Sequence, residues 1–314
     1  MNISVVIPLL NEEKNIPILY DELTQVLKKL SIKYELLFVD DGSSDSSLEI
    51  LQKLQLEDTH ICIISLRKNF GQTSAMSAGF DLAIGDVIIA MDADLQNDPA
   101  DIPLLLKKID EGVDLVTGWR YNRQDPFFSR KLPSKIANRI ISFATGVHLH
   151  DYGCTLKAFK REVIKTIKLY GEMHRFIPAI ASAMGVSIAE VKVNHRPRRF
   201  GSSKYGISRT LRVILDLITV KFLLNYATRP IHVFGTCGFI SGSFGATIAI
   251  VLIIQRQLYG VPLSDRPLLL LAVLFIFVGV QFITIGLVAE MLARTYHESQ
   301  DKPTYYIRKI IGRD

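Results

Sequence analysis

The chain of 314 residues is poor in cysteine, and its three cysteines lie far apart. Cys62, Cys154 and Cys237 fit neither the spacing of a zinc site nor that of a disulfide framework. The amino end also lacks the basic start and apolar core of a signal peptide, because an apolar β-branched stretch begins at residue 3. We therefore expect the amino end and the domain that it opens to stay in a reducing cytoplasm.

Two common nucleotide-binding motifs are missing as well. No Gly-x-Gly-x-x-Gly follows the first predicted strand, and no Gly-Lys-Ser/Thr loop occurs in the chain. A Rossmann dinucleotide site and a P-loop therefore lose their main support. Only the net charge of +6 favours nucleic acid, so we expect no nucleic acid among the partners.

Charged side chains are absent from two long apolar stretches. Residues 231–254 and 268–289 contain no Asp, Glu, Lys or Arg, and each exceeds the ~20 residues that span a bilayer. Their outer flanks are richer in Lys and Arg than the loop between them, which predicts a hairpin with both ends in the cytoplasm. Gly238 and Gly242 form a Gly-x-x-x-Gly that lets another helix approach closely, so a homo-oligomer is one possibility.

Acidic side chains are scarce just before this hairpin. Residues 196–229 carry eight Lys and Arg against a single acid, Asp216. A basic cluster beside an apolar segment favours anionic lipid headgroups. Apolar side chains recur at helical spacing from Ile207 to Phe222, which predicts an amphipathic helix in the membrane interface or packed on the preceding domain.

Before residue 120 the sequence alternates between strand and helix patterns. Apolar, β-branched stretches at 3–7, 34–39, 61–65, 87–91 and 115–117 predict strands, and amphipathic stretches lie between them. This alternation predicts a mostly parallel sheet with helices on both faces.

Carboxylates follow two of these predicted strands directly. Asp92 and Asp94 come after residues 87–91, and Asp40 and Asp41 end the strand at 34–39. The carboxyl ends of parallel strands meet at one edge of a sheet, where α/β proteins bind ligands. Two carboxylates one residue apart can hold Mg²⁺ or Mn²⁺, although an isolated Asp-x-Asp is also typical of a turn that caps a helix.

Eight short motifs occur in order along the chain. They are Val-Ile-Pro-x-x-Asn-Glu-Glu (6–13), Val-Asp-Asp-Gly-Ser-x-Asp (39–45), Asn-Phe-Gly-Gln (69–72), Met-Asp-Ala-Asp-Leu-Gln (91–96), Gly-Trp-Arg (118–120), Arg-Lys-x-x-Ser (130–134), Asp-Tyr-Gly-Cys (151–154) and Arg-Phe-Gly-x-Ser-Lys-Tyr (199–205). In these motifs the whole chain resembles the polyprenyl-phosphate glycosyltransferases of glycosyltransferase family 2, which include dolichol-phosphate mannose synthases and bactoprenol glucosyltransferases.

The resemblance implies an α/β catalytic domain of the GT-A fold, Rossmann-like with a mostly parallel sheet, over residues 1–205. Juxtamembrane amphipathic helices would follow at 206–229, and a two-helix transmembrane hairpin at 230–293, with helices at about 231–254 and 268–290. Residues 294–314 would be a cytoplasmic tail. The protein would be integral to the plasma membrane, with its catalytic domain and both termini in the cytoplasm.

The resemblance also implies substrates and site residues. The donor would be a nucleotide sugar, with a UDP-sugar favoured, and the acceptor a polyprenyl phosphate such as undecaprenyl phosphate. Donor contacts would come from Pro8, Glu12, Asp40, Asp41, Asp92, Arg199 and Lys204, and a divalent cation, Mg²⁺ or Mn²⁺, would bind to Asp92, Asp94 and Gln96. The acceptor phosphate would contact Arg120, Arg130 and Ser134, and Asp92, Asp94 and Arg120 would be the catalytic residues.

Departures from the family pattern bear on the sugar. Residues 151–157 read Asp-Tyr-Gly-Cys-Thr-Leu-Lys, where dolichol-phosphate mannose synthases tend to have Asp-x-x-Ser-Gly-Phe. The expected reaction is therefore inverting transfer of a hexose, first of all glucose from UDP-glucose, with GDP-mannose or a UDP-4-amino-arabinose derivative as alternative donors. A catalytically idle membrane scaffold or flippase subunit is the alternative of another class.

A dedicated general base is not required for this reaction. A lipid phosphate is already anionic near neutral pH, since its second pKa is about 6, whereas an alcohol acceptor usually needs a base. Asp151 and His174 are then expected either to orient the reactants or to serve the fold alone.

Overall fold

A computed structural model describes residues 1–121, 138–139, 141–142, 145–169, 173–200, 231–260, 262–263, 266–299 and 305–313. The chain forms two compact units, Met1–Val220 with Pro303–Asp314, and Lys221–Lys302. The amphipathic helices predicted for 206–229 lie outside the described residues, as do Arg130, Ser134 and Lys204.

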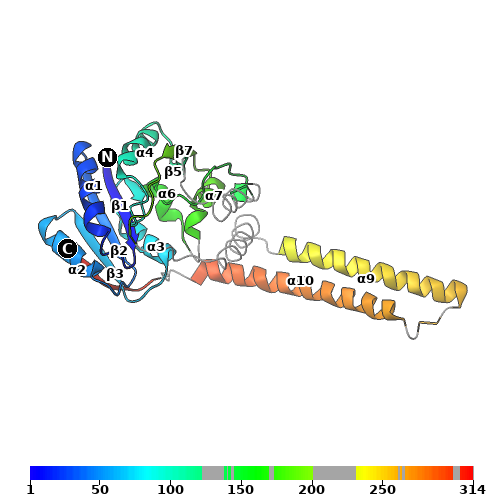
Figure 1. The fold of residues 1–314 in the computed structure, drawn as a ribbon. Coiled ribbons are helices and arrows are strands. Elements are labelled where there is room, and N and C mark those ends of the chain that lie inside the picture. Colours follow the sequence, from blue (N-terminus) through cyan, green and yellow to red (C-terminus); the bar gives the residue numbers. More distant parts are fainter. Residues whose placement is uncertain are drawn as a thin grey trace. The chain divides into compact units, whose positions relative to one another are not determined.

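An eight-stranded sheet forms the centre of the first unit, in the order β7-β5-β6-β4-β1-β2-β3-β8. Figure 1 labels β1, β2, β3, β5 and β7 of this sheet. Six strands share one direction, whereas β6 and β8 run antiparallel to their neighbours, so the mostly parallel sheet predicted from the sequence is confirmed. The strands are β1 (Asn2–Leu9), β2 (Lys33–Asp40), β3 (Ile61–Leu66), β4 (Val87–Ala90), β5 (Leu115–Arg120), β6 (Lys157–Lys160), β7 (Ile188–Val193) and β8 (Ile307–Ile311).

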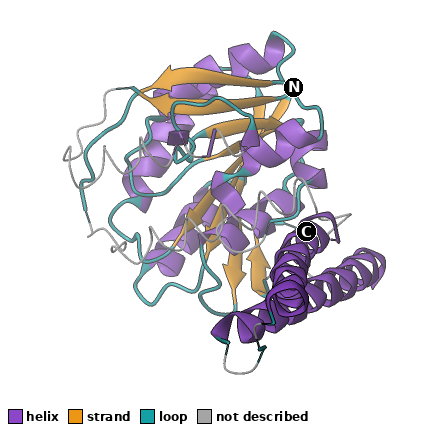
Figure 2. Cartoon of the chain, turned by 90° about the vertical axis from the view of Figure 1, so that its right-hand side faces the viewer, coloured by secondary structure: helices purple, strands orange, loops and turns teal. Residues whose placement is uncertain are grey.

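Helices pack on both faces of this sheet (Figure 2). One face is covered by α1 (Ile16–Lys29), α2 (Ser47–Glu57), the short helix η1 (Pro99–Asp101) and α4 (Ile102–Asp110). The other carries α3 (Gln72–Leu82), α6 (Arg161–Thr166), η3 (Met173–Arg175) and α7 (Ile177–Ala183). This is the layered arrangement that alternating strands and helices produce.

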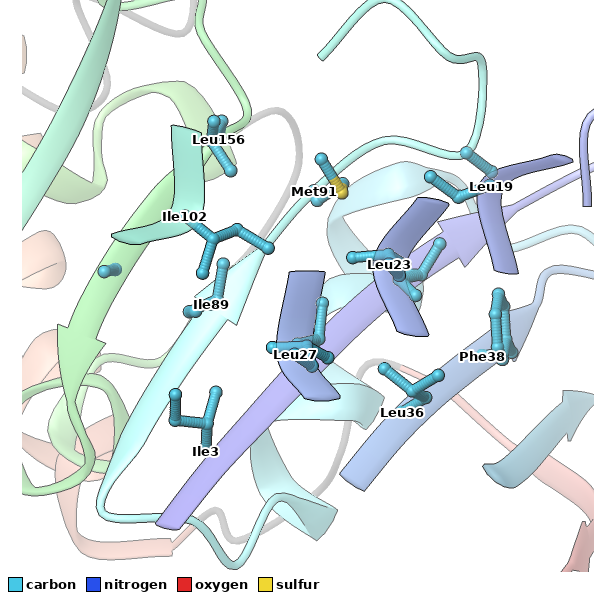
Figure 3. Packing of buried hydrophobic residues seen from close by; sticks show 14 of the residues in the cluster. Ile3, Leu19, Leu23, Leu27, Leu36, Phe38, Ile89, Met91, Ile102 and Leu156 are labelled. Atoms are coloured by element: carbon cyan, nitrogen blue, oxygen red, sulfur yellow. The ribbon is translucent and has the colours of Figure 1, made fainter. Parts of the chain in front are cut away.

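The core between α1 and the sheet shows why the strand ends are held rigidly (Figure 3). Leu19, Leu23 and Leu27 are fully buried and recur every four residues, so they lie on one side of α1. They pack with alternate strand residues such as Ile3 and Phe38, which are buried as well. Each of these side chains contributes about 1.5–3 kcal/mol by leaving water. Such packing fixes the backbone from which the loops at the sheet edge start.

The last strand was not foreseen in the sequence. Residues 294–314, predicted to be a tail, contain β8, which pairs antiparallel with β3 at the edge of the sheet. Tyr305 Oη also donates to Asp81 Oδ2 at 2.8 Å, which ties this segment to α3. Its sequence, Ile-Arg-Lys-Ile-Ile, does not alternate between apolar and polar residues as a half-buried strand does. The strand lies at the edge of the sheet, where Arg308 and Lys309 are exposed to solvent.

The second unit contains two long helices, α9 (Ile231–Tyr259) and α10 (Pro267–Ser299). By length and hydropathy, Ile231–Tyr259 and Pro267–Ala289 are candidate membrane spans. A Cβ on Gly238 would lie 2.6 Å from the carbonyl oxygen of Gly279, so glycine is required where α9 meets α10. The close approach predicted from Gly-x-x-x-Gly is therefore made within one chain, and a homo-oligomer stays a prediction.

Candidate functional site

The carboxyl ends of β1, β2 and β4 lie side by side because these strands are parallel neighbours. Pro8 lies near the end of β1, and Leu9 is in register with Asp40 at the end of β2. Asp92 follows β4 by two residues. The structure therefore brings the three predicted donor-binding segments to one edge of the sheet.

Hydrogen bonds join the loop after β1 to the turn after β2. Asn11 N donates to Ser43 Oγ at 2.9 Å, and Ser44 N donates to Asn11 Oδ1 at 2.8 Å. Asn11 has a left-handed φ of 54°. Glu12 N donates to Ser47 Oγ at 2.9 Å, which fixes the backbone of this predicted donor residue. These hydrogen bonds hold the two loops in a fixed position relative to each other.

The carboxylates of Asp40 and Asp41 both accept hydrogen bonds from backbone amides. Asp40 Oδ1 accepts a hydrogen bond from Ser43 N at 3.0 Å and so closes the turn after β2. Asp41 accepts from Phe70 N at 2.7 Å and from Gly71 N at 2.9 Å. Burial raises the pKa of the Asp41 carboxyl, and these two amides oppose the effect. Asp41 therefore positions residues 69–72 through their backbone.

Asp92 is held by two side chains from different parts of the chain. Gln72 Nε2 donates to its Oδ1 and Thr155 Oγ1 donates to its Oδ2, each at 2.7 Å. Burial, followed by the negative charge of Asp94, raises the pKa of Asp92 to about 6. The carboxylate is thus oriented by neutral donors, and its charge is incompletely compensated.

Asp94 is buried and forms an ion pair. Its Oδ2 lies 2.6 Å from Arg198 Nη2, and its Oδ1 accepts from Gln96 N at 3.1 Å. Leu95 between them has a φ of 61°, in the left-handed region that non-glycine residues rarely adopt. Such backbone conformations are concentrated at functional sites. The role of the Gln96 side chain as a metal ligand stays a prediction.

The two aspartates fit a hard divalent cation as a partial ligand set. Among the described residues no group of three or more His, Cys, Asp and Glu could hold a metal ion. Two carboxylates nevertheless suit Mg²⁺ or Mn²⁺, which commonly take their remaining ligands from substrate phosphate and water. A cation would also offset the repulsion from Asp94 that helps to raise the pKa of Asp92.

Arg120 lies at the end of β5 in a two-pronged ion pair with Asp151. Its Nε lies 2.6 Å from Asp151 Oδ2, and its Nη2 donates to Oδ1 at 2.9 Å. Burial alone would lower the pKa of Arg120, but the bonds to Asp151 raise it, so the guanidinium is permanently charged. Asp151 therefore orients this predicted acceptor-binding residue.

His174 has a packing role in this structure. Its Nδ1 lies 2.7 Å from Thr73 Oγ1, and Arg175 Nε donates to its Nε2 at 3.4 Å. Burial lowers its pKa well below the ordinary value. The imidazole is therefore neutral, and Nδ1 carries its proton toward Thr73.

Sequence patterns missed four residues that build this site. Gln72 stands in the motif 69–72 and Thr155 in the stretch 151–157, but nothing local showed that both donate to Asp92. Arg198 contacts Asp94, whereas the predicted neighbour Arg199 is exposed. Lys157 is buried beside Ala90 in register, and its Nζ donates to the carbonyl oxygens of Tyr152 and Cys154. Lys157 is the first residue of the short strand β6, and nothing in the local sequence showed that this lysine would be buried.

The chain is similar in sequence to several known proteins. The family model described as Glycosyl transferase family 2 matches residues 4–168. Dodecaprenyl-phosphate galacturonate synthase of Rhizobium johnstonii is 44% identical over 99% of this chain and 93% of the relative. Undecaprenyl-phosphate 4-deoxy-4-formamido-L-arabinose transferase of Photorhabdus laumondii is 40% identical over 99% of this chain and 94% of the relative.

Solved structures with the same fold are more distant in sequence. Glucosyl-3-phosphoglycerate synthase of Mycobacterium tuberculosis, in complex with Mn²⁺ and UDP-glucose, covers 70% of this chain and 78% of its own, with a TM-score of 0.56 and 18% identity. Mannosyl-3-phosphoglycerate synthase of Rubrobacter xylanophilus covers 71% and 74%, with a TM-score of 0.58 and 18% identity. At this identity the likeness concerns the fold alone.

Proposed function

The chain belongs to glycosyl transferase family 2, and we propose that it transfers a sugar from a nucleotide sugar to the phosphate of a polyprenyl phosphate. The observation that carries this proposal is the match, along nearly all of both chains, to relatives named for polyprenyl-phosphate products. A match of this extent includes the two apolar helices, which a soluble sugar transferase would not need.

The donor sugar is narrowed by the same relatives. Their names support galacturonate or 4-deoxy-4-formamido-L-arabinose, and the second belongs with the amino-arabinose alternative weighed from the sequence. Glucose, favoured from the sequence, has no support among these two names. We therefore place UDP-galacturonate and UDP-4-deoxy-4-formamido-L-arabinose ahead of UDP-glucose and GDP-mannose as donors.

The proposed donor site follows from the loops at the sheet edge. Pro8, Glu12, Asp40 and Asp41 lie around the ends of β1 and β2, where a base and ribose would bind. Asp92 and Asp94 would hold Mg²⁺ or Mn²⁺, with Gln96 as a further proposed ligand. Bound there, the cation would supply positive charge for the leaving diphosphate. Arg199 and Lys204 are proposed to contact the same diphosphate.

In the proposed reaction an oxygen of the lipid phosphate attacks the anomeric carbon of the sugar. The new bond joins that carbon to the phosphate oxygen, while the bond from the carbon to the nucleoside diphosphate breaks. Arg120, kept charged and oriented by Asp151, would bind the incoming phosphate together with Arg130 and Ser134. Because the nucleophile is already an anion, no side chain must remove a proton.

The membrane orientation is proposed on two grounds. Lys and Arg are enriched outside the two candidate spans, which favours the cytoplasm for both flanks. In addition, the chain on both sides of α9 and α10 belongs to the first unit, since β8 joins its sheet. A hairpin with both ends in one domain places that domain on one side of the membrane.

A donor panel tests the proposal. Purified protein is incubated with undecaprenyl phosphate and each of the four nucleotide sugars, and glycolipid is detected by mass spectrometry. We expect product from UDP-galacturonate or the UDP-formamidoarabinose. Product from UDP-glucose alone would restore the first prediction of the sugar. Folded protein that forms no product with any donor would contradict the proposed reaction and favour an idle scaffold.

A further inference from the structure

One short loop, residues 67–72, connects the two ends of the proposed donor site. At its centre Phe70 N and Gly71 N donate to the carboxylate of Asp41, at 2.7 and 2.9 Å. At its end Gln72 Nε2 donates to Asp92 Oδ1 at 2.7 Å. Any shift of this loop would therefore disturb both carboxylates together.

The loop is supported on one side by the turn after β2. Gly42 has a φ of +75°, and a Cβ at this position would lie 2.8 Å from the carbonyl carbon of Lys68 and 2.9 Å from Asn69 N. The backbone of the loop thus packs directly on the backbone of the Asp-Asp-Gly-Ser turn, where a side chain would separate them.

The other support comes from the end of the chain. The carbonyl oxygen of Tyr306 accepts from Arg67 N at 3.0 Å, next to the pairing of Leu66 with Ile307. The ring of Tyr306 lies 6.1 Å from that of Phe70, at an interplanar angle of 47°. Tyr306 is 63% exposed, so the burial of its side chain adds little to the hydrophobic core. Its described aromatic partner is the residue whose amide binds Asp41.

We propose that Tyr306, which follows the apolar hairpin in the sequence, is a positioning residue for the loop 67–72 and through it for the nucleotide-sugar site. The expected effect of Tyr306 on nucleotide binding rests on the proposed function. Its expected effect on the conformation of the loop does not. Donor binding would then depend on Tyr306, although none of the family motifs includes this residue.

Hydrogen exchange and nucleotide binding test this proposal on the full-length protein. Tyr306→Ala removes the ring and keeps the backbone bond, and Tyr306→Phe keeps the ring. Arg308→Ala is the matched control, an exposed side chain of β8. We expect Tyr306→Ala to speed amide exchange in a peptide that covers residues 67–72, and to weaken binding of UDP with Mn²⁺ about three- to tenfold, the range for one aromatic contact. Tyr306→Phe and Arg308→Ala should match the wild type in both measurements.

A double variant separates a specific contact from general loosening. If Tyr306 acts through Phe70, then Phe70→Ala with Tyr306→Ala should weaken UDP binding no more than Phe70→Ala alone. Unchanged exchange in Tyr306→Ala, or faster exchange with unchanged UDP affinity, would overturn the proposal. If the wild type itself fails to bind UDP, the proposed function fails, and the exchange result alone then decides whether Tyr306 positions the loop.

Discussion

Burial and the neighbouring carboxylate of Asp94 make the charge of Asp92 costly, and the hydrogen bond from Thr155 offsets this cost only in part. The Asp92 pKa of about 6 instead of 3.8 corresponds to at most about 3 kcal/mol of lost stability at neutral pH. A buried carboxylate such as Asp92, whose charge lowers the stability of the fold, is typical of a functional site.

Replacing Asp92 should therefore stabilise the protein and abolish its activity. In Asp92→Asn the amide oxygen still accepts from Gln72 and the amide nitrogen donates to Thr155, so the free energy of unfolding without divalent cation should rise by about 1–3 kcal/mol. Thermal unfolding in detergent measures this, together with sugar transfer. Asp45→Asn is the control, since hydrogen bonds lower the pKa of Asp45 despite its burial and its loss should destabilise. A lower melting temperature for Asp92→Asn would contradict the assignment.

The pH dependence of cation binding follows from the same pKa. Below about pH 6 Asp92 takes up a proton, so the affinity for Mn²⁺ should fall up to about tenfold per pH unit. The folded protein binds this proton more tightly than the unfolded chain, so the contribution of Asp92 to stability is favourable at low pH and is lost as the pH rises through 6. Titration of Mn²⁺ in the presence of UDP, followed by electron paramagnetic resonance from pH 5 to 7.5, measures the affinity. An affinity that does not vary over this range would contradict the prediction.

Local sequence was sufficient for some site residues and insufficient for others. Asp92 and Asp94 could be predicted because they directly follow an apolar strand. The pairing of Arg120 with Asp151 could not, because 31 residues separate them and only the order of β5 and β6 brings them together. Whether Arg198 or its neighbour contacts Asp94 depends on the course of an irregular loop, which has no periodic signal.

At the scale of elements, local sequence was sufficient to predict β1 to β5 and insufficient to predict β8. The first five strands are apolar and alternate with amphipathic helices, so the sequence pattern predicts that these strands exist and that most of them run parallel. β8 lies at an edge, carries exposed basic side chains and pairs with β3 across more than two hundred residues of chain. No local pattern indicates a pairing at that separation.

The contact between α9 and α10 yields a prediction for single methyl groups. Gly238→Ala places a Cβ 2.6 Å from the carbonyl oxygen of Gly279, whereas Gly242→Ala places one with no atom within 4 Å. Gly238→Ala should therefore force the helices apart and cost about 1–3 kcal/mol, and Gly242→Ala should be tolerated. Thermal stability in detergent compares the two. Equal melting temperatures would show that the two helices do not pack through Gly238.

At the scale of the whole molecule, both flanks of the hairpin are proposed to lie on the cytoplasmic side. In a Cys237→Ala background, Gln257→Cys lies in the last turn of α9 and Arg308→Cys lies in β8, and both positions are exposed. A maleimide that cannot cross membranes should label Gln257→Cys in intact spheroplasts, and Arg308→Cys only after lysis. The remaining cysteines, Cys62 and Cys154, are buried and should give little background. Labelling in the opposite order would invert the topology.

The most direct test of the central claim compares acceptors. The protein is given its best nucleotide sugar from the donor panel with either undecaprenyl phosphate or undecaprenol, and Asp94→Asn is assayed beside the wild type. We expect glycolipid from the phosphate alone, and an activity at least about a hundredfold lower in Asp94→Asn than in the wild type. Transfer to the alcohol, or full activity in Asp94→Asn, would contradict a reaction in which a phosphate anion attacks at this edge of the sheet.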